Sequence, residues 1–211
     1  MKIIDASVEL AQEIDAEQIM KHIERAGRVC YKSESRISDT SAEKFIANII
    51  KSGHESVIEH VSLTFKIICD RGITHEIVRH RLASYSQESS RYCNYSGDKF
   101  GNELTFIKPC FWKEDDENYL LWKKTLEVIE QNYMALIKNG AKPQEARSIL
   151  PNSLKTEIFM TANLREWRHF LKLRTSPRAH PQMREVALQI YKILKEKLPV
   201  IFADIEVAAN A

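Results

Sequence analysis

The chain has 211 residues, with 28% charged and 44% hydrophobic side chains and a formal net charge of +2. These proportions are ordinary for a globular protein, and a chain of this length buries roughly 70% of its unfolded surface without a disulfide or a metal. A dedicated nucleic-acid-binding protein usually has a larger basic excess, so the weak charge argues against that class. The sequence contains no apolar stretch of membrane-spanning length, and its N-terminus lacks the pattern of a signal peptide.

The four cysteines lie far apart and form no C-x-x-C pair; they are Cys30, Cys69, Cys93 and Cys110. Closely paired cysteines would indicate a metal site, and an export signal would favour disulfides. Because the sequence shows neither feature, we expect reduced thiols in a cytoplasmic protein that does not associate with a membrane.

Two helices are predicted in the first third of the chain, after a short β-leaning segment at residues 2–9. Asp15 can cap the first helix. Thr40 and Glu43 fit a capping box at the start of the second, in which each side chain satisfies a free backbone donor. Gly53 is a suitable residue to end that helix.

The middle of the chain predicts two strands and two helices. Apolar and polar side chains alternate over residues 61–69, which indicates a strand. A helix follows Gly72 and brings residues 79–81 near its C-terminal end, where the helix dipole favours cations. Residues 103–108 read as a second strand. The longest helix comes next and closes at Gly140.

The last third begins with Pro143, which suits the first turn of a short helix. Alternation over residues 154–162 predicts another strand, and helices are expected over 164–174 and from Pro181 onward. No glycine-rich or proline-rich linker divides the chain. We therefore expect one α+β domain over residues 1–211, with helices packed on a mostly antiparallel sheet.

Residues 79–92 stand out by composition, with three arginines, one histidine, four serines and two tyrosines in fourteen positions. The stretch has neither the mixed charges of a solvated helix nor the alternation of a core strand. Arginine forks and hydroxyl donors suit a phosphate and a planar polar ring, so we predict a polar lining of a binding site. A salt-bridged surface loop at a subunit contact is the alternative.

Two histidine-containing segments raise the question of a zinc site. Helical zinc motifs place two histidines at i and i+4, so that both face one ion. His54 and His60 are six residues apart, and His75 and His80 are five apart. Neither pair fits, and we expect no metal.

Four segments of the chain are similar to one known family. Arg79-His80-Arg81, followed after seven residues by Ser89, reproduces the signature of the flavin-dependent thymidylate synthases (ThyX). Residues 53–60 resemble that family's Gly-His-Glu-Ser/Thr-x-x-Glu-His segment. Residues 163–174 resemble its C-terminal segment, and Arg147 before Leu150-Pro151 falls in the place of another. The resemblance covers about residues 40–190.

The resemblance implies an enzyme that converts dUMP to dTMP. FAD would be its redox cofactor, with NADPH as reductant and methylenetetrahydrofolate as carbon donor. Members are homotetramers with active sites at subunit interfaces, and they use no covalent cysteine. This agrees with the residues, because Cys110 after Pro109 is the nearest likeness to a nucleophile and reads better as a buried or half-buried thiol. The sequence also has no glycine-rich dinucleotide loop.

The resemblance also assigns roles to residues. Arg174 would lie against the uracil ring and stabilise it as an anion. Residues that would bind dUMP, chiefly at its phosphate, are Glu76, Arg79, Gln87, Ser89, Ser90, Arg91, Arg147 and Arg174. Residues that would line the FAD are Ser56, Arg79, His80, Arg81, Asn163, Arg165 and His169. His54 would lie over the flavin ring near the folate entrance.

Three of these positions depart from the family pattern. Glu76 stands where several members have glutamine, Gln87 where some have glutamate, and His169 where others have asparagine. Taken alone, Arg165 and Arg174 read as solvated helix arginines, and His54 and His60 as helix-end caps.

The spacing of two arginines predicts an oligomer independently of the family. Consecutive helical residues point roughly 100° apart, so Arg79 and Arg81 cannot serve one ligand from a regular helix. One of them would contact nucleotide and the other FAD, across a subunit boundary. Two other functions remain open from the sequence: a different FAD-dependent reductase or oxidase, and a non-enzymatic nucleotide- or RNA-binding module.

Overall fold

The computed structural model describes residues 1–207, which fall into two compact units. The first unit consists of Met1–Ser7, Ile67–Arg79 and Ser86–Ile158. The second consists of Val8–Lys66, His80–Tyr85 and the chain from Phe159 onward.

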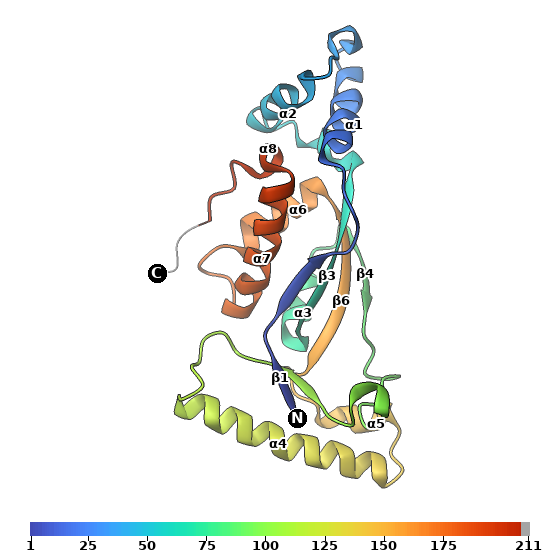
Figure 1. The fold of residues 1–211 in the computed structure, drawn as a ribbon, viewed down its shortest axis with the longest axis vertical. Helices are drawn as coiled ribbons and strands as arrows, with labels where there is room; N and C mark the ends of the chain where they lie inside the picture. Colours follow the sequence, from blue (N-terminus) through green and yellow to red (C-terminus); the bar gives the residue numbers. More distant parts are fainter. Residues whose placement is uncertain (208–211) are drawn as a thin grey trace. The chain divides into compact units, whose positions relative to one another are not determined.

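Helices and strands are mixed along the chain (Figure 1). The strands are β1 (Lys2–Ile4), β2 (Ser7–Leu10), β3 (Ser62–Asp70), β4 (Ala83–Gln87), β5 (Thr105–Ile107) and β6 (Lys155–Asn163). The helices are α1 (Ala16–Val29), α2 (Ser41–Lys51), α3 (Arg71–Ile77), α4 (Glu117–Lys138), α5 (Pro143–Ala146), α6 (Leu164–Arg174), α7 (Pro181–Lys197) and α8 (Pro199–Phe202). Short 3₁₀ helices are η1 (Glu34–Arg36), η2 (Glu55–His60), η3 (Asp98–Phe100) and η4 (Arg147–Ile149).

The strands form a four-stranded sheet in the order β2-β3-β6-β4 and a separate parallel pair of β1 with β5. The expected α+β class with a mostly antiparallel sheet is confirmed. The prediction that residues 1–211 form one domain stays a prediction. None of the helices in residues 1–207 combines the length and apolar composition that crossing a lipid bilayer requires.

In the second unit, α1 packs against α2, as Figure 1 shows. The predicted cap of α1 is confirmed, because the Asp15 side chain accepts the backbone N–H of Gln18 at 3.1 Å. The helices approach closely at Gly27, where a Cβ atom would lie 2.7 Å from the Phe45 ring. The predicted capping box of α2 is wrong, since Thr40 makes no side-chain cap bond. The hydroxyl of Ser41 instead accepts the backbone N–H of Ser38.

A second part of this unit places α6 against the sheet. Phe65 of β3 is fully buried and meets the Trp167 ring edge-on, with 4.9 Å between ring centroids. The indole N–H of Trp167 donates to the carbonyl oxygen of Leu63 at 3.0 Å. Helix α7 packs beside α6. Helix α6 is therefore anchored in the core to β3.

The core of the first unit lies under α4. Its buried side chains come from α4, β5 and the segments around them, namely Tyr95, Leu104, Phe106, Leu126, Tyr133, Ala146 and Leu154. The predicted end of α4 is confirmed, because Gly140 has a φ of +93°, which a glycine adopts without strain.

Residues 79–92 differ from the sequence prediction in one respect. Helix α3 ends at Ile77, so residues 79–81 lie beyond it, and Ala83–Gln87 then form β4 at one end of the sheet order. Half-buried and exposed residues do alternate along β4. The half-buried positions hold Ala83, Tyr85 and Gln87, which are not uniformly apolar. Apolar and polar residues therefore do not alternate along β4, and a hydrophobicity pattern does not predict the strand.

Arg168 of α6 holds the C-terminal segment through an ion pair with Asp204. Its side chain is 1% exposed, and its guanidinium forms a two-pronged ion pair with Asp204 at 2.6 and 2.7 Å and a contact with Glu55 at 3.0 Å. The bond from Arg168 holds the pKa of the Asp204 carboxyl below its ordinary value. This contribution to stability is therefore present at neutral pH and is lost as the pH falls through the lowered pKa.

We expect Arg168→Met to lower the free energy of unfolding by about 2 kcal/mol, less than for a wholly buried pair because the Asp204 side chain is 46% exposed. The difference in the free energy of unfolding is measured by urea denaturation, with circular dichroism as the signal. Lys197→Met, which removes an exposed cation, should leave the midpoint unchanged. Equal midpoints for wild type and Arg168→Met would show that the buried ion pair does not stabilise this segment.

Candidate functional site

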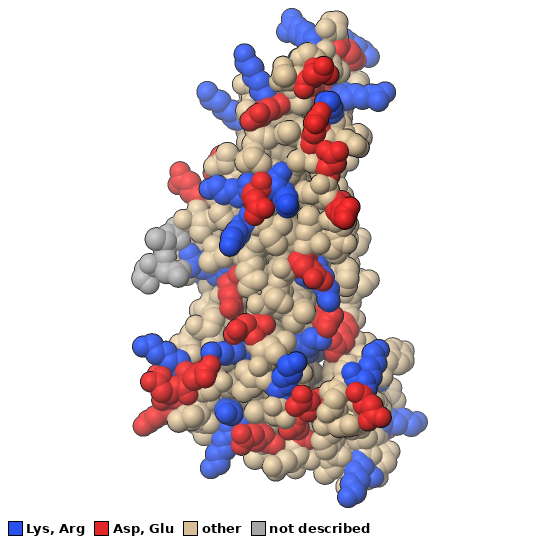
Figure 2. Space-filling view, in the orientation of Figure 1, with Lys and Arg blue, Asp and Glu red and all other residues tan. Residues whose placement is uncertain are grey.

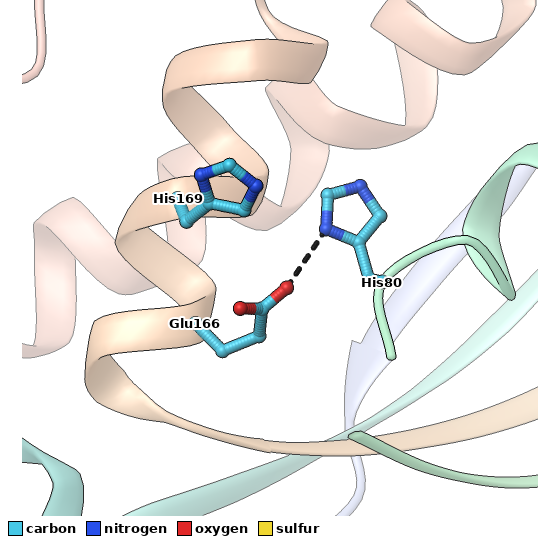
Figure 3. A group of neighbouring side chains, drawn as sticks. All are labelled: His80, Glu166 and His169. Carbon is cyan, nitrogen blue, oxygen red and sulfur yellow. Dashed lines mark hydrogen bonds and ion pairs between the residues drawn. The ribbon is translucent and has the colours of Figure 1, made fainter. Parts of the chain in front are cut away.

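The centre of the candidate site is His80, whose side chain makes hydrogen bonds at both ring nitrogens. The residue is 4% exposed. Its Nδ1 lies 2.9 Å from Oε1 of Glu166, and its Nε2 lies 3.1 Å from Nε of Arg174. Figure 3 shows His80 facing Glu166 and His169, which project from one side of α6. All four residues belong to the second unit.

The two hydrogen bonds fix the tautomer of the imidazole. Arginine is only a donor, so Nε2 of His80 must carry a lone pair. The ring proton then resides on Nδ1 and is donated to Glu166. Burial lowers the pKa of His80 below its ordinary value, and the charge of Arg174 lowers it further, while the hydrogen bond to Glu166 acts in the opposite direction. The hydrogen bond from Arg174 therefore requires a neutral imidazole, and the lowered pKa acts in the same direction.

Glu166 reaches His80 from the first turn of α6. Asn163 caps this helix, because its side-chain oxygen accepts the backbone N–H of Glu166 at 2.9 Å. The pattern Asn-x-x-Glu is typical of a capping box, in which the glutamate would turn back to the capping residue. Here the Glu166 carboxylate turns to His80 instead.

The side chains of His80, Glu166 and His169 include the donor types of a metal site, with ligand atoms within 4.8 Å of one another. The hydrogen bond from Arg174 argues against a cation there. A metal at Nδ1 would leave the ring proton on Nε2, opposite the N–H of Arg174, and two donors would then face each other. We therefore interpret the group as a hydrogen-bonded relay.

A pocket of about 590 Å³ lies on the same face of α6 as Glu166. Its lining residues are Glu55, Glu59, Leu82, Asn163, Arg165, Glu166, His169 and Lys172. The structure thus brings together three of the residues predicted to line FAD: Asn163, Arg165 and His169. Arg165 is exposed and pairs with Glu59 at 2.6 Å.

A smaller pocket of about 350 Å³ contains two further predicted residues, His54 and Ser56. Arg165 lines both pockets. The hydroxyl of Tyr31 lies 3.3 Å from Nδ1 of His54. His54 stands at the capping position of η2 but its side chain makes no cap bond, so the alternative of a helix-end cap is not supported.

Most of the residues predicted to bind dUMP belong to the first unit, namely Glu76, Arg79, Gln87, Ser89, Ser90, Arg91 and Arg147. Gln87 is oriented by the hydroxyls of Thr74 and Thr156, to which its amide donates at 3.1 and 3.3 Å. Ser89 accepts the backbone N–H of Arg91 at 3.3 Å, and Ser90 is buried.

The arginines of this set are exposed. Within residues 1–207, Arg79, Arg91 and Arg147 form no ion pair with an acidic side chain. Their charge therefore stays available for an anion. No hydrogen bond among the described residues joins Arg147 to the segment Gln87–Arg91. Arg81 is likewise exposed, just before β4.

Sequence reasoning missed Glu166. A glutamate three residues after a capping asparagine has an ordinary structural explanation, and its partner His80 lies 86 positions earlier in the chain. The Arg79-His80-Arg81 signature indicates that His80 belongs to the site, but it does not indicate the carboxylate of Glu166.

The state of His80 can be measured directly. We expect NMR of the ring nitrogens to show the Nδ1–H tautomer at pH 7 and a titration midpoint below the ordinary histidine value of about 6.5. A His80→Gln variant assigns the resonance. A proton on Nε2, or a midpoint above that of a free histidine, would contradict the hydrogen-bond assignment.

Comparisons with known proteins agree on one family. The thymidylate synthase complementing protein family (Thy1) matches residues 10–200. Proteins named flavin-dependent thymidylate synthase are similar: that of Pyrococcus furiosus is 43% identical over 166 residues, which is 78% of this chain and 66% of the relative. That of Geobacter sulfurreducens is 34% identical over 186 residues, 85% of this chain and 78% of the relative. The Corynebacterium efficiens protein is 32% identical over 214 residues, 96% of this chain and 86% of the relative.

A solved structure has the same fold. It is a UMP/dUMP methylase from Streptomyces cacaoi bound with 5-Br dUMP, which superposes with a TM-score of 0.78 at 26% identity and covers 96% of each chain. The chain spans 66% of the length of the Pyrococcus relative. Because the family match extends over most of the sequence, this chain belongs to the thymidylate synthase complementing protein family, the flavin-dependent thymidylate synthases.

Proposed function

We propose that this chain is a flavin-dependent thymidylate synthase, which reductively methylates dUMP to dTMP. The observation that carries the proposal is the environment of Arg174. A solvated helix arginine would have no fixed partner, whereas the Arg174 guanidinium is held by a buried neutral histidine. An enzyme that must stabilise a developing negative charge requires such a donor to be in place before reaction.

The larger pocket supports a flavin cofactor, which we propose is FAD. Arg165 and Lys172 supply donors for phosphate groups, and Leu82, 74% exposed, offers apolar surface to a ring. Each cation faces an acid, Glu59 at 2.6 Å and Glu55 at 3.6 Å, that a phosphate would replace. The other residues that we assign to FAD are Ser56, Arg79, His80, Arg81, Asn163 and His169. When bound, the flavin supplies the redox chemistry.

The chain's own residues then bind and orient dUMP. We assign the phosphate to Arg79, Arg91 and Arg147 with the hydroxyls of Ser89 and Ser90, because arginine offers paired donors to phosphate oxygens. Glu76 and Gln87 are assigned to the remaining contacts, and Arg174 to the uracil ring. The guanidinium of Arg174 stays charged at every working pH, so it stabilises the ring as an anion.

A covalent thiolate has no part in this proposal. All four cysteines lie within residues 1–207 and no disulfide joins them. Burial raises the pKa of the Cys69 thiol, and it also raises that of Cys93. These two thiols, held protonated in this way, are poor nucleophiles. Cys110 is exposed, so the expectation of a buried or half-buried thiol at that position is wrong.

NADPH as reductant, methylenetetrahydrofolate as carbon donor, a cytoplasmic location and a homotetramer complete the proposal. His54 in the smaller pocket is assigned to the folate entrance. Support for assembly comes from large apolar side chains left exposed on α4, namely Leu120, Leu121 and Val128. Exposed apolar side chains grouped on one element are typical of an interaction surface. Basic and acidic side chains are interspersed on the face drawn in Figure 2, which argues against a nucleic-acid-binding module.

Arg174→Ala tests the uracil assignment. We expect kcat with dUMP to fall roughly 100-fold or more, because the charge that stabilises the ring anion is removed, while flavin binding is retained. Arg25→Ala, an exposed arginine of α1, serves as control and should keep the wild-type rate. Near-normal turnover of Arg174→Ala would eliminate the assignment.

Arg91→Gln tests the phosphate assignment. Loss of a charged hydrogen bond should weaken dUMP binding roughly tenfold. Deoxyuridine, which lacks the phosphate, should bind wild type and variant equally. Calorimetric titration of both ligands measures the difference. An equal loss for the two ligands would place Arg91 away from the phosphate.

A further inference from the structure

Glu166 is a buried carboxylate that none of the assignments above uses. Its side chain is 6% exposed, and its Oε1 accepts the Nδ1 proton of His80 at 2.9 Å. A carboxylate is costly to bury unless it is hydrogen-bonded, and the simplest local use, the return bond of a capping box, is not made in the described chain. The group is therefore committed to His80.

We infer that Glu166 is a positioning residue: it holds His80 in the tautomer that accepts the hydrogen bond of Arg174, and so fixes the guanidinium that faces the uracil ring. The inference rests on the proposed function, because Arg174 has its role in that reaction.

The argument follows the direction of the two hydrogen bonds. Donors and acceptors alternate from Arg174 through His80 to Glu166. A neutral imidazole without an acceptor at Nδ1 populates both tautomers. In the other tautomer the Nε2 proton would face the N–H of Arg174, and the guanidinium would have to turn away. Removing a carboxylate to which no contact with dUMP is assigned would thus displace Arg174, to which the uracil ring is assigned.

Several titratable groups surround His80, and most of them face its ring. Glu166, His169 and Arg174 face the ring from α6, and the His80 and His169 ring centroids are 5.6 Å apart. From β4, the Tyr85 hydroxyl donates to the His80 carbonyl oxygen at 2.5 Å, which fixes the backbone and not the ring. Among these groups Glu166 is the acceptor for the Nδ1 proton.

The experiment compares Glu166→Ala with Glu166→Gln. Glutamine keeps an oxygen that accepts the Nδ1 proton, whereas alanine removes it. Glu24→Ala is the matched control, since Glu24 is a buried glutamate of the same unit that pairs with Arg28 at 2.7 Å, away from the site. Steady-state kinetics at saturating FAD, the pH profile of kcat and NMR of the His80 ring nitrogens are measured for each protein.

We expect Glu166→Ala to mix the His80 tautomers and to lower kcat roughly 10- to 100-fold, with the KM for dUMP little changed because the phosphate contacts remain. Glu166→Gln should restore most of kcat. The acid limb of the kcat profile of Glu166→Gln should move to lower pH. The reason is that Glu166 raises the pKa of His80, and that protonation of His80 removes the lone pair at Nε2 that accepts from Arg174. The Glu24→Ala control should lose stability but keep the wild-type pH profile.

Two results would overturn the inference: an unchanged His80 tautomer in Glu166→Ala, or unchanged kcat at saturating FAD. If the alanine variant does not fold, an unshifted acid limb in Glu166→Gln overturns it as well. Failure of the proposed function is separate, because it would show as no dTMP from the wild-type protein. The tautomer of His80 and the Nε resonance of Arg174 would then still decide whether Glu166 holds the relay.

Discussion

The position of Arg174 depends on two hydrogen bonds that pass through one buried histidine. His80 accepts from Arg174 and donates to Glu166, so each bond sets the direction of the other. The imidazole must be neutral for this to hold, and burial together with the neighbouring guanidinium lowers its pKa in that direction. A positive charge is thereby held beside the imidazole before any ligand binds.

The fold of the second unit supplies what this relay needs. Helix α6 carries Glu166 and Arg174, and Trp167 anchors the helix to β3 through an aromatic contact and a hydrogen bond to the strand. Asn163 fixes the start of the helix. Because Glu166 and Arg174 project from one capped helix, the backbone sets the spacing of the two residues around His80.

Much of the fold and part of the site could be predicted from the sequence. Asp15 and Gly140 marked helix ends correctly, because capping and positive φ depend on local chemistry. The strand β4 was missed because its half-buried residues, Ala83, Tyr85 and Gln87, are not a run of apolar side chains. Glu166 was missed because its partner is distant in sequence, and because a glutamate three residues after an asparagine is common at an ordinary helix start. The arginine signature indicated the family, but neither the tautomer of His80 nor the ion pair of Arg165 with Glu59 follows from a motif.

The most direct test of the central claim is dTMP formation by the purified wild-type protein, given dUMP, methylenetetrahydrofolate, NADPH and FAD, with each component omitted in turn. The account predicts dTMP only when dUMP, the folate and a reduced flavin are all present. Flavin reduction without any dTMP would contradict it and favour a different FAD-dependent reductase or oxidase on the same fold.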